Sequence, residues 1–414
     1  MPLSLVPSLD DSTNSMVSLD QLQPEFLPHP STVSSTASFR EPTLDELRAL
    51  QREAGYPLVS VLMSTAPDML IGVDHVFGIE RLVDEAGKRL RLEVPGPEAD
   101  QLVEAMCNAA RRLIGQRTAH GVAVFASSRG CKVYRIGSRV DDRIVVDPTF
   151  ATRDLARSLA LNPTYRLLVL TQGSARLLVG SGSQLVEVKD GKFPITTRAN
   201  TNGKINQLVT SRGAEDRGNR STIAAKQRKG LHDDSAFVRR VSMALGAHVP
   251  SAQLPLVAIV STALASTFKS QTAIHSVGML IGSHERTSAS RLANLVRPAI
   301  EAHLADERES ALTRLDQAIS ARQAAVGINH VWTAAQRGVI DTLVVDESFR
   351  FPAWTTLGGK SLVRAFTPEQ PDVIDDAVDE IIEMVQRLNS AVCFVPAGEV
   401  GTDKIAAVLK RQAG

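Results

Sequence analysis

The chain has 414 residues, of which 43% are hydrophobic and 22% are charged, and its formal net charge is +1. Because domains average roughly 100–200 residues, this length predicts two to four globular domains with substantial cores. A net charge near zero excludes a uniformly basic nucleic-acid coat protein but is compatible with a local basic patch. The three cysteines (Cys107, Cys131 and Cys393) form no CxxC pair. Their spacing argues against a zinc ribbon or a disulfide scaffold and indicates a reducing compartment.

Residues 1–40 differ from the rest in composition. They contain nine Ser and five Pro, and Arg40 is their only Lys or Arg. Such a segment cannot bury enough apolar surface to offset the entropy of ordering, so we expect a disordered tail. The N-terminus lacks the basic flank and apolar run of a signal peptide. Residues 241–268 carry no charged side chain, but their apolar stretch Leu254–Val260 is far shorter than the roughly 20 residues that cross a bilayer. We expect a cytoplasmic protein with no membrane partner.

Residues 41–160 have the pattern of an N-terminal α/β domain. A helix is expected after the cap-like Thr43, followed by a buried strand at 56–63. Apolar residues at helical spacing predict two further helices, and two short apolar runs joined by Ser-Ser-Arg-Gly predict a hairpin. The expected helices span 76–92 and 97–114, and the expected hairpin strands span 120–126 and 132–136.

Residues 161–305 form the expected central domain. Apolar segments at 166–171, 175–180 and 184–188, separated by turn-like Gly and Ser residues, predict an antiparallel meander. A loop without periodicity occupies 198–230. After it we expect a helix that includes 237–245, a buried strand at 254–260 and a helix at 263–269.

Residues 306–414 form the expected C-terminal α/β domain, which a long helical stretch at 288–325 leads into. Helix and strand alternate here, a pattern typical of a compact α/β layer. The expected helices span 327–337, 372–389 and 402–411, and the expected strands span 341–346 and 390–396. The predicted fold class is therefore mixed α+β in three domains behind an N-terminal tail.

Several motifs resemble catalytic or ligand-binding signatures but fail on spacing. Gly358-Gly359-Lys360-Ser361 lacks the first glycine of a P-loop, because Trp354 stands in that place. The turn at 180–184 matches neither a dinucleotide fingerprint nor a nucleophile elbow. His232-Asp233-Asp234 reads as a helix start rather than a metal site, because three adjacent residues cannot converge on one ion there. We therefore predict no catalytic residue, metal or cofactor.

The basic loop 198–230 calls for a functional explanation. It carries eight basic residues against Glu215 and Asp216, and it has no aromatic side chain. Lys and Arg that neutralise phosphates give affinity without sequence preference, and without aromatics there is no platform for reading bases. A solvated linker is the alternative. The predicted RNA-binding residues are Arg198, Lys204, Arg212, Arg217, Arg220, Lys226, Arg228 and Lys229.

The order of elements around this loop resembles a known family. The meander at 165–188, the basic loop, the helix from His232 to Leu245 and the strand at 255–260 resemble the central domain of archaeo-eukaryotic peptide release factors and Pelota. The stretches 327–346, 391–396 and 404–410 are similar to the C-terminal domain of that superfamily, the last two as its closing strand and helix. The stretches 56–65 and 120–126 are similar to its bacterial branch, the bacterial archaeo-eukaryotic release factor-like proteins.

This resemblance covers about 41–414 and implies a three-domain ribosome-binding factor that occupies the A site in hibernation, stalling or rescue. It implies ribosomal RNA as a partner, and elongation factor Tu or another translational GTPase as a further one. Release factors carry Gly-Gly-Gln in the loop after the meander, whereas this loop has Gly203-Lys204-Ile205-Asn206-Gln207. The expected function is therefore binding without ester hydrolysis. Two alternatives stay open: a peptidyl- or aminoacyl-tRNA ester hydrolase that uses Gln207, and a protein-interaction scaffold.

Overall fold

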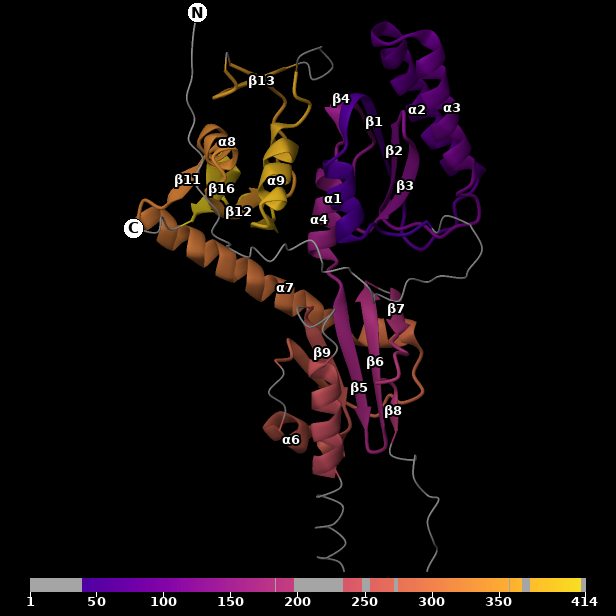
Figure 1. Cartoon of the computed structure of the whole chain (residues 1–414), viewed down its shortest axis with the longest axis vertical. Helices are drawn as coiled ribbons and strands as arrows, with labels where there is room; N and C mark the ends of the chain where they lie inside the picture. The colour runs from indigo at the N-terminus through magenta and orange to yellow at the C-terminus, as the bar shows by residue number, and fades with distance from the viewer. Residues whose placement is uncertain are drawn as a thin grey trace, which may run out of the picture. The chain divides into compact units, whose positions relative to one another are not determined.

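The computed structural model describes residues 39–182, 184–196, 234–247, 254–271, 275–356, 358–366 and 373–410. Over these ranges the chain is mixed α/β and contains separate sheets in its N-terminal, central and C-terminal thirds (Figure 1). The predicted fold class is confirmed. The basic loop 198–230 lies outside the described residues.

The N-terminal sheet is antiparallel, with the strand order β3-β2-β1-β4. Side chains of β1 alternate between two cores: Val59 and Val61 face α2 and α3, whereas Leu62 faces the side on which α1 packs. The predicted helices, buried strand and hairpin are confirmed, and β4 and α4 are additional elements. The bounds are α1 (Leu44–Gln51), β1 (Ala54–Ser64), α2 (Val73–Glu93), α3 (Gly96–Arg111), β2 (Gly121–Ser127), β3 (Gly130–Ile136), β4 (Arg143–Thr149) and α4 (Arg153–Leu161).

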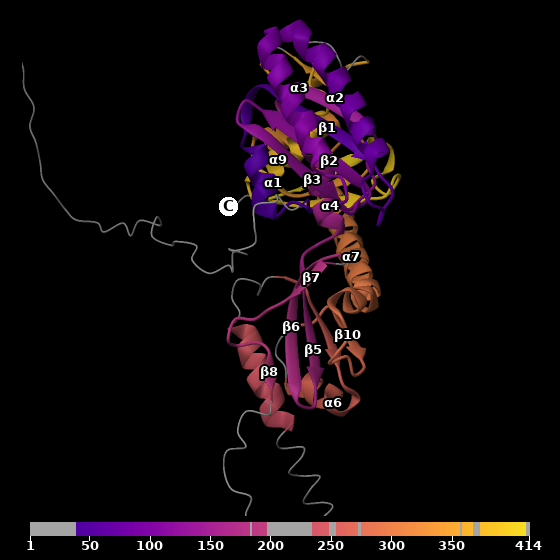
Figure 2. The ribbon, with the colours of Figure 1, turned by 90° about the vertical axis from the view of Figure 1, so that its right-hand side faces the viewer.

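The central sheet has the order β10-β9-β5-β6-β7, with β8 paired to β6 (Figure 2). Strands β5, β9 and β10 are parallel, while β5, β6 and β7 form the predicted meander. A helix at 234–246 and α6 pack on one face of this sheet, and α7 packs on the other. The bounds are β5 (Tyr165–Thr171), β6 (Ser174–Ser181), β7 (Gln184–Glu187), β8 (Ile195–Thr196), β9 (Leu256–Val260), α6 (Thr262–Gln271), β10 (Gly278–Ile281) and α7 (Ala289–Ser320).

The C-terminal sheet has the order β11-β16-β12-β15, in which β12 and β15 are parallel. On β12, Leu343 and Val345 pack toward α8 and α9, whereas Val344 packs toward α7. A small hairpin, β13-β14, follows β12. The bounds are β11 (Ala324–Val326), α8 (Ile328–Gln336), β12 (Ile340–Asp346), β13 (Ala353–Thr355), β14 (Leu362–Arg364), α9 (Ala377–Arg387), β15 (Ala391–Val395) and β16 (Ile405–Leu409).

The predicted C-terminal helix at 402–411 is wrong, because residues 405–409 form strand β16 between β11 and β12. Lys404 has φ +57°, a conformation that stops a right-handed helix before it begins. Beyond it, Ile405 and Ala407 face one core and Ala406 faces the other, which is the period of a strand. Ala406 and Ala407 are compatible with a helix, but pairing with β11 and β12 makes the segment a strand.

The N-terminal and C-terminal sheets share one hydrophobic core, in which residues of α1 and α4 cluster with residues of α8, α9 and β12. Helix α7 is continuous across residue 305, where the sequence predicts a domain boundary. The predicted boundaries at 160 and 305 stay predictions. At the other end, Phe39 is buried and the Arg40 carbonyl accepts from the Arg135 amide, so both residues belong to the folded part.

A buried polar network also joins α4 to α9. The Arg153 guanidinium lies 3.3 Å from an Asp376 carboxylate oxygen, and the Thr152 hydroxyl donates to Glu383 across 3.0 Å. Burial, together with the nearby Glu380 carboxylate, raises the pKa of Glu383 to about 8. Burial and the same carboxylate raise the pKa of Asp147, at the end of β4, to about 7. Burial therefore raises the pKa values of two carboxyl groups at this junction toward neutral pH.

Candidate nucleic-acid interface

The predicted RNA-binding residues and Gln207 all lie within 197–233, outside the described residues. The structure describes the two points between which this segment runs, Thr196 at the end of β8 and Asp234 at the start of the helix at 234–246. We call Thr196 and Asp234 the two roots of the segment, and the described part of the candidate interface lies around them. His232 and Asp233, the first residues of the expected helix start, also lie outside the described part.

Both roots lie at the same end of the central sheet. The Arg240 guanidinium donates to the Thr196 carbonyl across 3.2 Å, and the Lys192 ammonium donates to the Ala247 carbonyl across 3.0 Å. The helix therefore runs antiparallel to residues 192–196. Counting back six residues from Arg240 at about 1.5 Å each places the helix start about 9 Å beyond Thr196. The chain leaves and returns on the same side.

The helix at 234–246 is fixed to the sheet by its apolar face. Phe237, Val238 and Val241 are buried against Leu168 and Leu177 of the sheet. Such spacing is that of an amphipathic helix, whose opposite face is left to solvent. The segment 197–233 is therefore anchored to a packed element at its second root.

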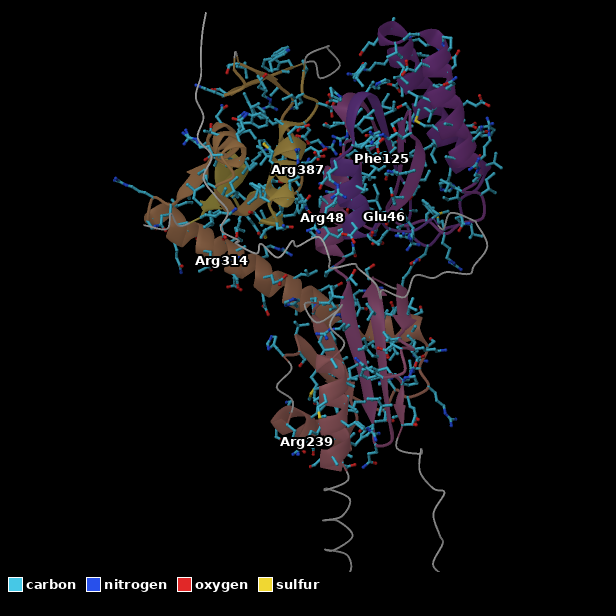
Figure 3. All side chains as sticks on the ribbon, viewed as in Figure 1. Glu46, Arg48, Phe125, Arg239, Arg314 and Arg387 are labelled. Atoms are coloured by element: carbon cyan, nitrogen blue, oxygen red, sulfur yellow. The ribbon has the colours of Figure 1, made fainter. Side chains whose placement is uncertain are left out.

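Two arginines occupy the exposed face of this helix next to the segment. Arg239, labelled in Figure 3, and Arg240 are both exposed. The Arg240 guanidinium also lies 5.4 Å from the centre of the Phe237 ring, which holds it in place. Neither arginine forms an ion pair with a described carboxylate, so both charges are available to an anion at the roots of the basic loop.

The roots coincide with the carboxyl edge of the parallel strands. Thr196 pairs with Ser174, which directly follows the turn after β5. Strands β9 and β10 run parallel to β5 and end at Val260 and Ile281, on the same edge. In open α/β sheets this edge is where ligands bind. The basic loop is therefore attached where the fold places binding sites.

Arg176 fixes the loop that leaves this edge after β10. Its guanidinium donates to the carbonyls of Glu285 and Thr287 across 2.8 and 3.3 Å, and it pairs with Glu187 at 2.9 Å. Because all its contacts are internal, we treat Arg176 as a positioning residue of the edge rather than a contact for RNA.

Two kinds of reactive group are relevant among the described residues: clusters of metal ligands and activated thiols. Over those ranges no three His, Cys, Asp or Glu side chains are grouped to hold a metal ion. All three cysteines are free, and burial raises the pKa of Cys131 to about 12 and also raises the pKa of Cys393. Protonated thiols are poor nucleophiles. In the part of the chain that is described, no helix is long and apolar enough to span a membrane.

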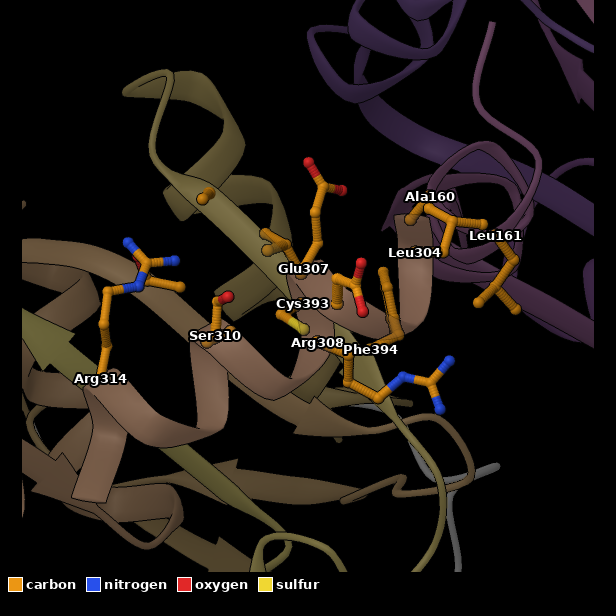
Figure 4. Close-up of a pocket in the computed structure, with 14 residues that line it drawn as sticks. Ala160, Leu161, Leu304, Glu307, Arg308, Ser310, Arg314, Cys393 and Phe394 are labelled. Atoms are coloured by element: carbon orange, nitrogen blue, oxygen red, sulfur yellow. The ribbon is translucent and has the colours of Figure 1, made fainter. Parts of the chain in front are cut away.

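A cavity of about 380 Å³ lies between α7 and β15 (Figure 4). Leu304 and Phe394 contribute apolar surface, and Glu307, Arg308 and Arg314 contribute charges. Cys393 is its only thiol, and burial keeps that thiol protonated. The described lining of the cavity therefore contains no activated sulfur nucleophile.

Sequence reasoning missed the cations at the roots. Lys192, Arg239 and Arg240 lie just outside the predicted loop 198–230 and were not included among its binding residues. For the two arginines a signal was present: Phe237-Val238-Arg239-Arg240-Val241 places adjacent cations opposite a buried apolar stripe. For Lys192 only the fold shows proximity, because its partner Ala247 is 55 residues away in sequence.

Comparison with known families gives one match. The model described as Bacterial archaeo-eukaryotic release factor family 3 matches residues 164–338. This range begins just before β5 and runs past α8, so it contains the whole central sheet, both roots and the segment between them. Among curated proteins none matches the sequence significantly.

Solved structures similar to this chain include an archaeal translation termination factor and Pelota-like proteins. An archaeal termination factor, aRF1, is 14% identical, with 89% of this chain and 96% of that chain covered and a TM-score of 0.23. Archaeal Pelota, from a model of ribosome-bound Pelota and ABCE1, is 12% identical, with 90% and 95% covered and a TM-score of 0.37. Dom34 from S. cerevisiae is 10% identical, with 70% and 78% covered and a TM-score of 0.36.

Proposed function

We propose that this chain, whose residues 164–338 belong to the bacterial archaeo-eukaryotic release factor-like family, is a ribosome-binding factor that occupies the A site without hydrolysing an ester. Its setting would be ribosome hibernation, stalling or rescue in the cytoplasm. The observation that carries the proposal is the double anchoring of the basic segment. Its two roots lie at one end of the central sheet, the edge at which α/β folds bind ligands.

Binding depends on charge rather than on base recognition. The sequence of the basic loop contains eight cationic residues against two acidic ones, Glu215 and Asp216. The exposed Arg239 and Arg240 add two more cations at one root. Cations of this kind neutralise phosphates of ribosomal RNA and release counterions. Since the loop has no aromatic residue, it contributes no stacking platform. The central sheet carries the loop toward large-subunit RNA near the peptidyl-transferase centre.

The other two sheets act as supports in this proposal. The N-terminal and C-terminal sheets share a core and a buried ion pair, Arg153–Asp376, so they can behave as one body. They would contact the small subunit and the factor-binding region, where elongation factor Tu or another translational GTPase is the partner we propose. The proposal requires no cofactor.

The sequence lacks the tripeptide that release factors carry in this loop. No Gly-Gly-Gln tripeptide occurs in the 414 residues, and Gln207 follows Ile205-Asn206 instead of two glycines. Glycines let a backbone approach a substrate closely, which bulkier residues prevent. Occupation of the site is therefore the favoured mode of action.

Two measurements test this function. Tagged protein should co-sediment with ribosomes from stationary-phase cells; protein that stays in the supernatant would favour a protein-interaction scaffold. Ribosomes loaded with peptidyl-tRNA should release no peptide above background on addition of the purified chain. Rapid release that is abolished by Gln207→Ala would replace the proposed function with that of an ester hydrolase.

A further inference from the structure

A second cationic site lies in the C-terminal sheet, at the carboxyl end of β12. It is a groove of about 470 Å³, which we call the Phe349–Phe351 groove. The two phenylalanine rings lie 6.1 Å apart and are half-buried. The proposed function makes no use of this groove. Its lining residues are Ile328, Ser348, Phe349, Arg350, Phe351, Arg364, Thr402, Asp403 and Lys404.

Buried polar groups hold the loop that carries the two rings. An Asp346 carboxylate oxygen accepts from the Ser348 amide and hydroxyl across 2.8 and 2.7 Å. The Phe351 amide donates to Asp376 across 3.0 Å, and the Arg153 guanidinium donates to the Glu347 carbonyl across 2.7 Å. Asp346, Asp376 and Arg153 are at most 4% exposed. The rings are thus fixed before any ligand arrives, which lowers the entropy cost of binding.

Two exposed cations are aligned with these rings. The Arg364 guanidinium lies 5.6 Å from the Phe351 ring centre, and the Lys404 ammonium lies 5.9 Å from the Phe349 ring centre. Neither forms an ion pair with a described carboxylate. A third cation, Arg350, is already paired with Asp141 and Asp154. With Asp403 also in the lining, Arg364 and Lys404 leave the groove a net charge of +1, not counting the paired Arg350.

This combination suits a nucleotide. A phosphate matches the two exposed cations, and a base can stack on the outer side of the Arg364 guanidinium plane. Ser348, Thr402 and Asp403 add hydroxyl and carboxylate groups that can bond a ribose hydroxyl. An acidic peptide would satisfy the charges but would leave the exposed Arg364 guanidinium plane without a planar partner. A volume of about 470 Å³ falls within the range of small-ligand sites.

We propose that the Phe349–Phe351 groove binds single-stranded RNA, with a phosphate held by Arg364 and Lys404 and a base stacked on the outer side of the exposed Arg364 guanidinium, which the Phe351 ring supports from below. This site would give the chain a second RNA contact, independent of the basic loop and of the proposed A-site role. Since none of its residues belongs to 164–338 except Ile328, the matched family segment does not contain it.

The test measures binding of a labelled oligoribonucleotide of about ten nucleotides by fluorescence anisotropy. The host is the full chain in which Arg212, Arg217, Arg220, Lys226, Arg228 and Lys229 are replaced by Gln, so that the basic loop adds little. In this host we compare Arg364→Gln/Lys404→Asn with the control Arg337→Gln/Lys360→Gln. Asn is chosen at 404 because it tolerates the positive φ of that position. The control removes one exposed Arg and one exposed Lys of the same sheet region.

The groove variant should bind at least tenfold more weakly than the control. Its log–log salt slope should flatten by about 1.4, because each single-strand phosphate that is no longer neutralised is worth about 0.7. Phe349→Leu, which keeps an apolar side chain but removes the ring, should also weaken binding about tenfold. DNA of the same sequence should bind more weakly than RNA.

Equal affinity and equal slope for the groove variant and the control would overturn the proposal. Tighter binding of a poly-glutamate peptide than of RNA would assign the groove to an acidic protein instead. Circular dichroism and thermal unfolding establish that each variant is folded. Failure here is distinguishable from failure of the A-site role, which is measured with intact ribosomes and the native basic loop.

Discussion

Replacing Arg153 by Met tests whether the N-terminal and C-terminal sheets are joined by a buried charge. Arg153 is 1% exposed and lies 3.3 Å from Asp376, which is itself buried. Its guanidinium also donates to the carbonyls of Glu347 and Asp346 across 2.7 and 3.4 Å. Met fills part of the same space but leaves the buried Asp376 carboxylate without its cationic partner and the Glu347 carbonyl without its shortest hydrogen bond.

Removal of one partner of a buried ion pair costs about 3–5 kcal/mol, so Arg153→Met should lower the free energy of unfolding by that amount. Urea unfolding followed by circular dichroism measures it. Arg139→Met, at an exposed position, is the matched control and should stay within about 0.5 kcal/mol of the wild type. Arg153→Met/Asp376→Asn should lose about 0.5–3 kcal/mol less than the sum of its single changes. A loss from Arg153→Met no larger than that of the control would refute the reasoning.

Three further predictions concern other parts of the chain. Protonated Glu383 and Asp147 stabilise the fold, because their pKa values are raised from 4.5 and 3.8 to about 8 and about 7. This contribution to stability is complete below about pH 4 and is lost as the pH rises to about 8, so the free energy of unfolding should fall over that window. Glu383→Gln should flatten the fall near pH 8. A pH profile that is unchanged in this variant would contradict the raised pKa of Glu383. Deletion of residues 1–38 should leave the melting temperature unchanged, and a large decrease would show that the tail packs. Phe39→Ala, which removes a buried ring, should lower the free energy of unfolding by about 3 kcal/mol. Arg239→Gln/Arg240→Gln should weaken ribosome binding several-fold without lowering stability, and identical binding would remove the roots from the interface.

Much of the fold can be predicted from continuous apolar runs. Strands β1 and β5 lie in the middle of their sheets and are bounded by turn residues, so length and composition identify them. The meander follows from its two Gly- and Ser-containing turns. Strand β4 was missed because its sequence, Arg143–Thr149, contains a proline and three charged or polar residues. Its pairing with β1 depends on partners 81 to 95 residues earlier, which no local pattern reveals.

The candidate sites, too, are predictable from the sequence only where their residues are close together along the chain. The charge of the basic loop is readable because its residues are consecutive, and the family resemblance is confirmed for 164–338. For 41–163 and 339–414 that resemblance stays a prediction. The Phe349–Phe351 groove draws on α8, β14 and the residues before β16, so its cations and rings are dispersed in sequence. Only the fold brings Lys404 over Phe349, 55 residues away.

The central claim, that the basic loop binds ribosomal RNA through its phosphates, is tested most directly by a pair of co-sedimentation titrations. Wild type and the six-fold variant Arg212→Gln, Arg217→Gln, Arg220→Gln, Lys226→Gln, Arg228→Gln and Lys229→Gln are titrated with ribosomes between about 50 and 200 mM salt. The variant should fold normally, bind more weakly and show a flatter salt dependence, by about 0.7–0.9 in log–log slope for each phosphate that its side chains no longer neutralise. Identical affinity and identical slope for the two proteins would mean that the loop is a solvated linker, and would contradict the account.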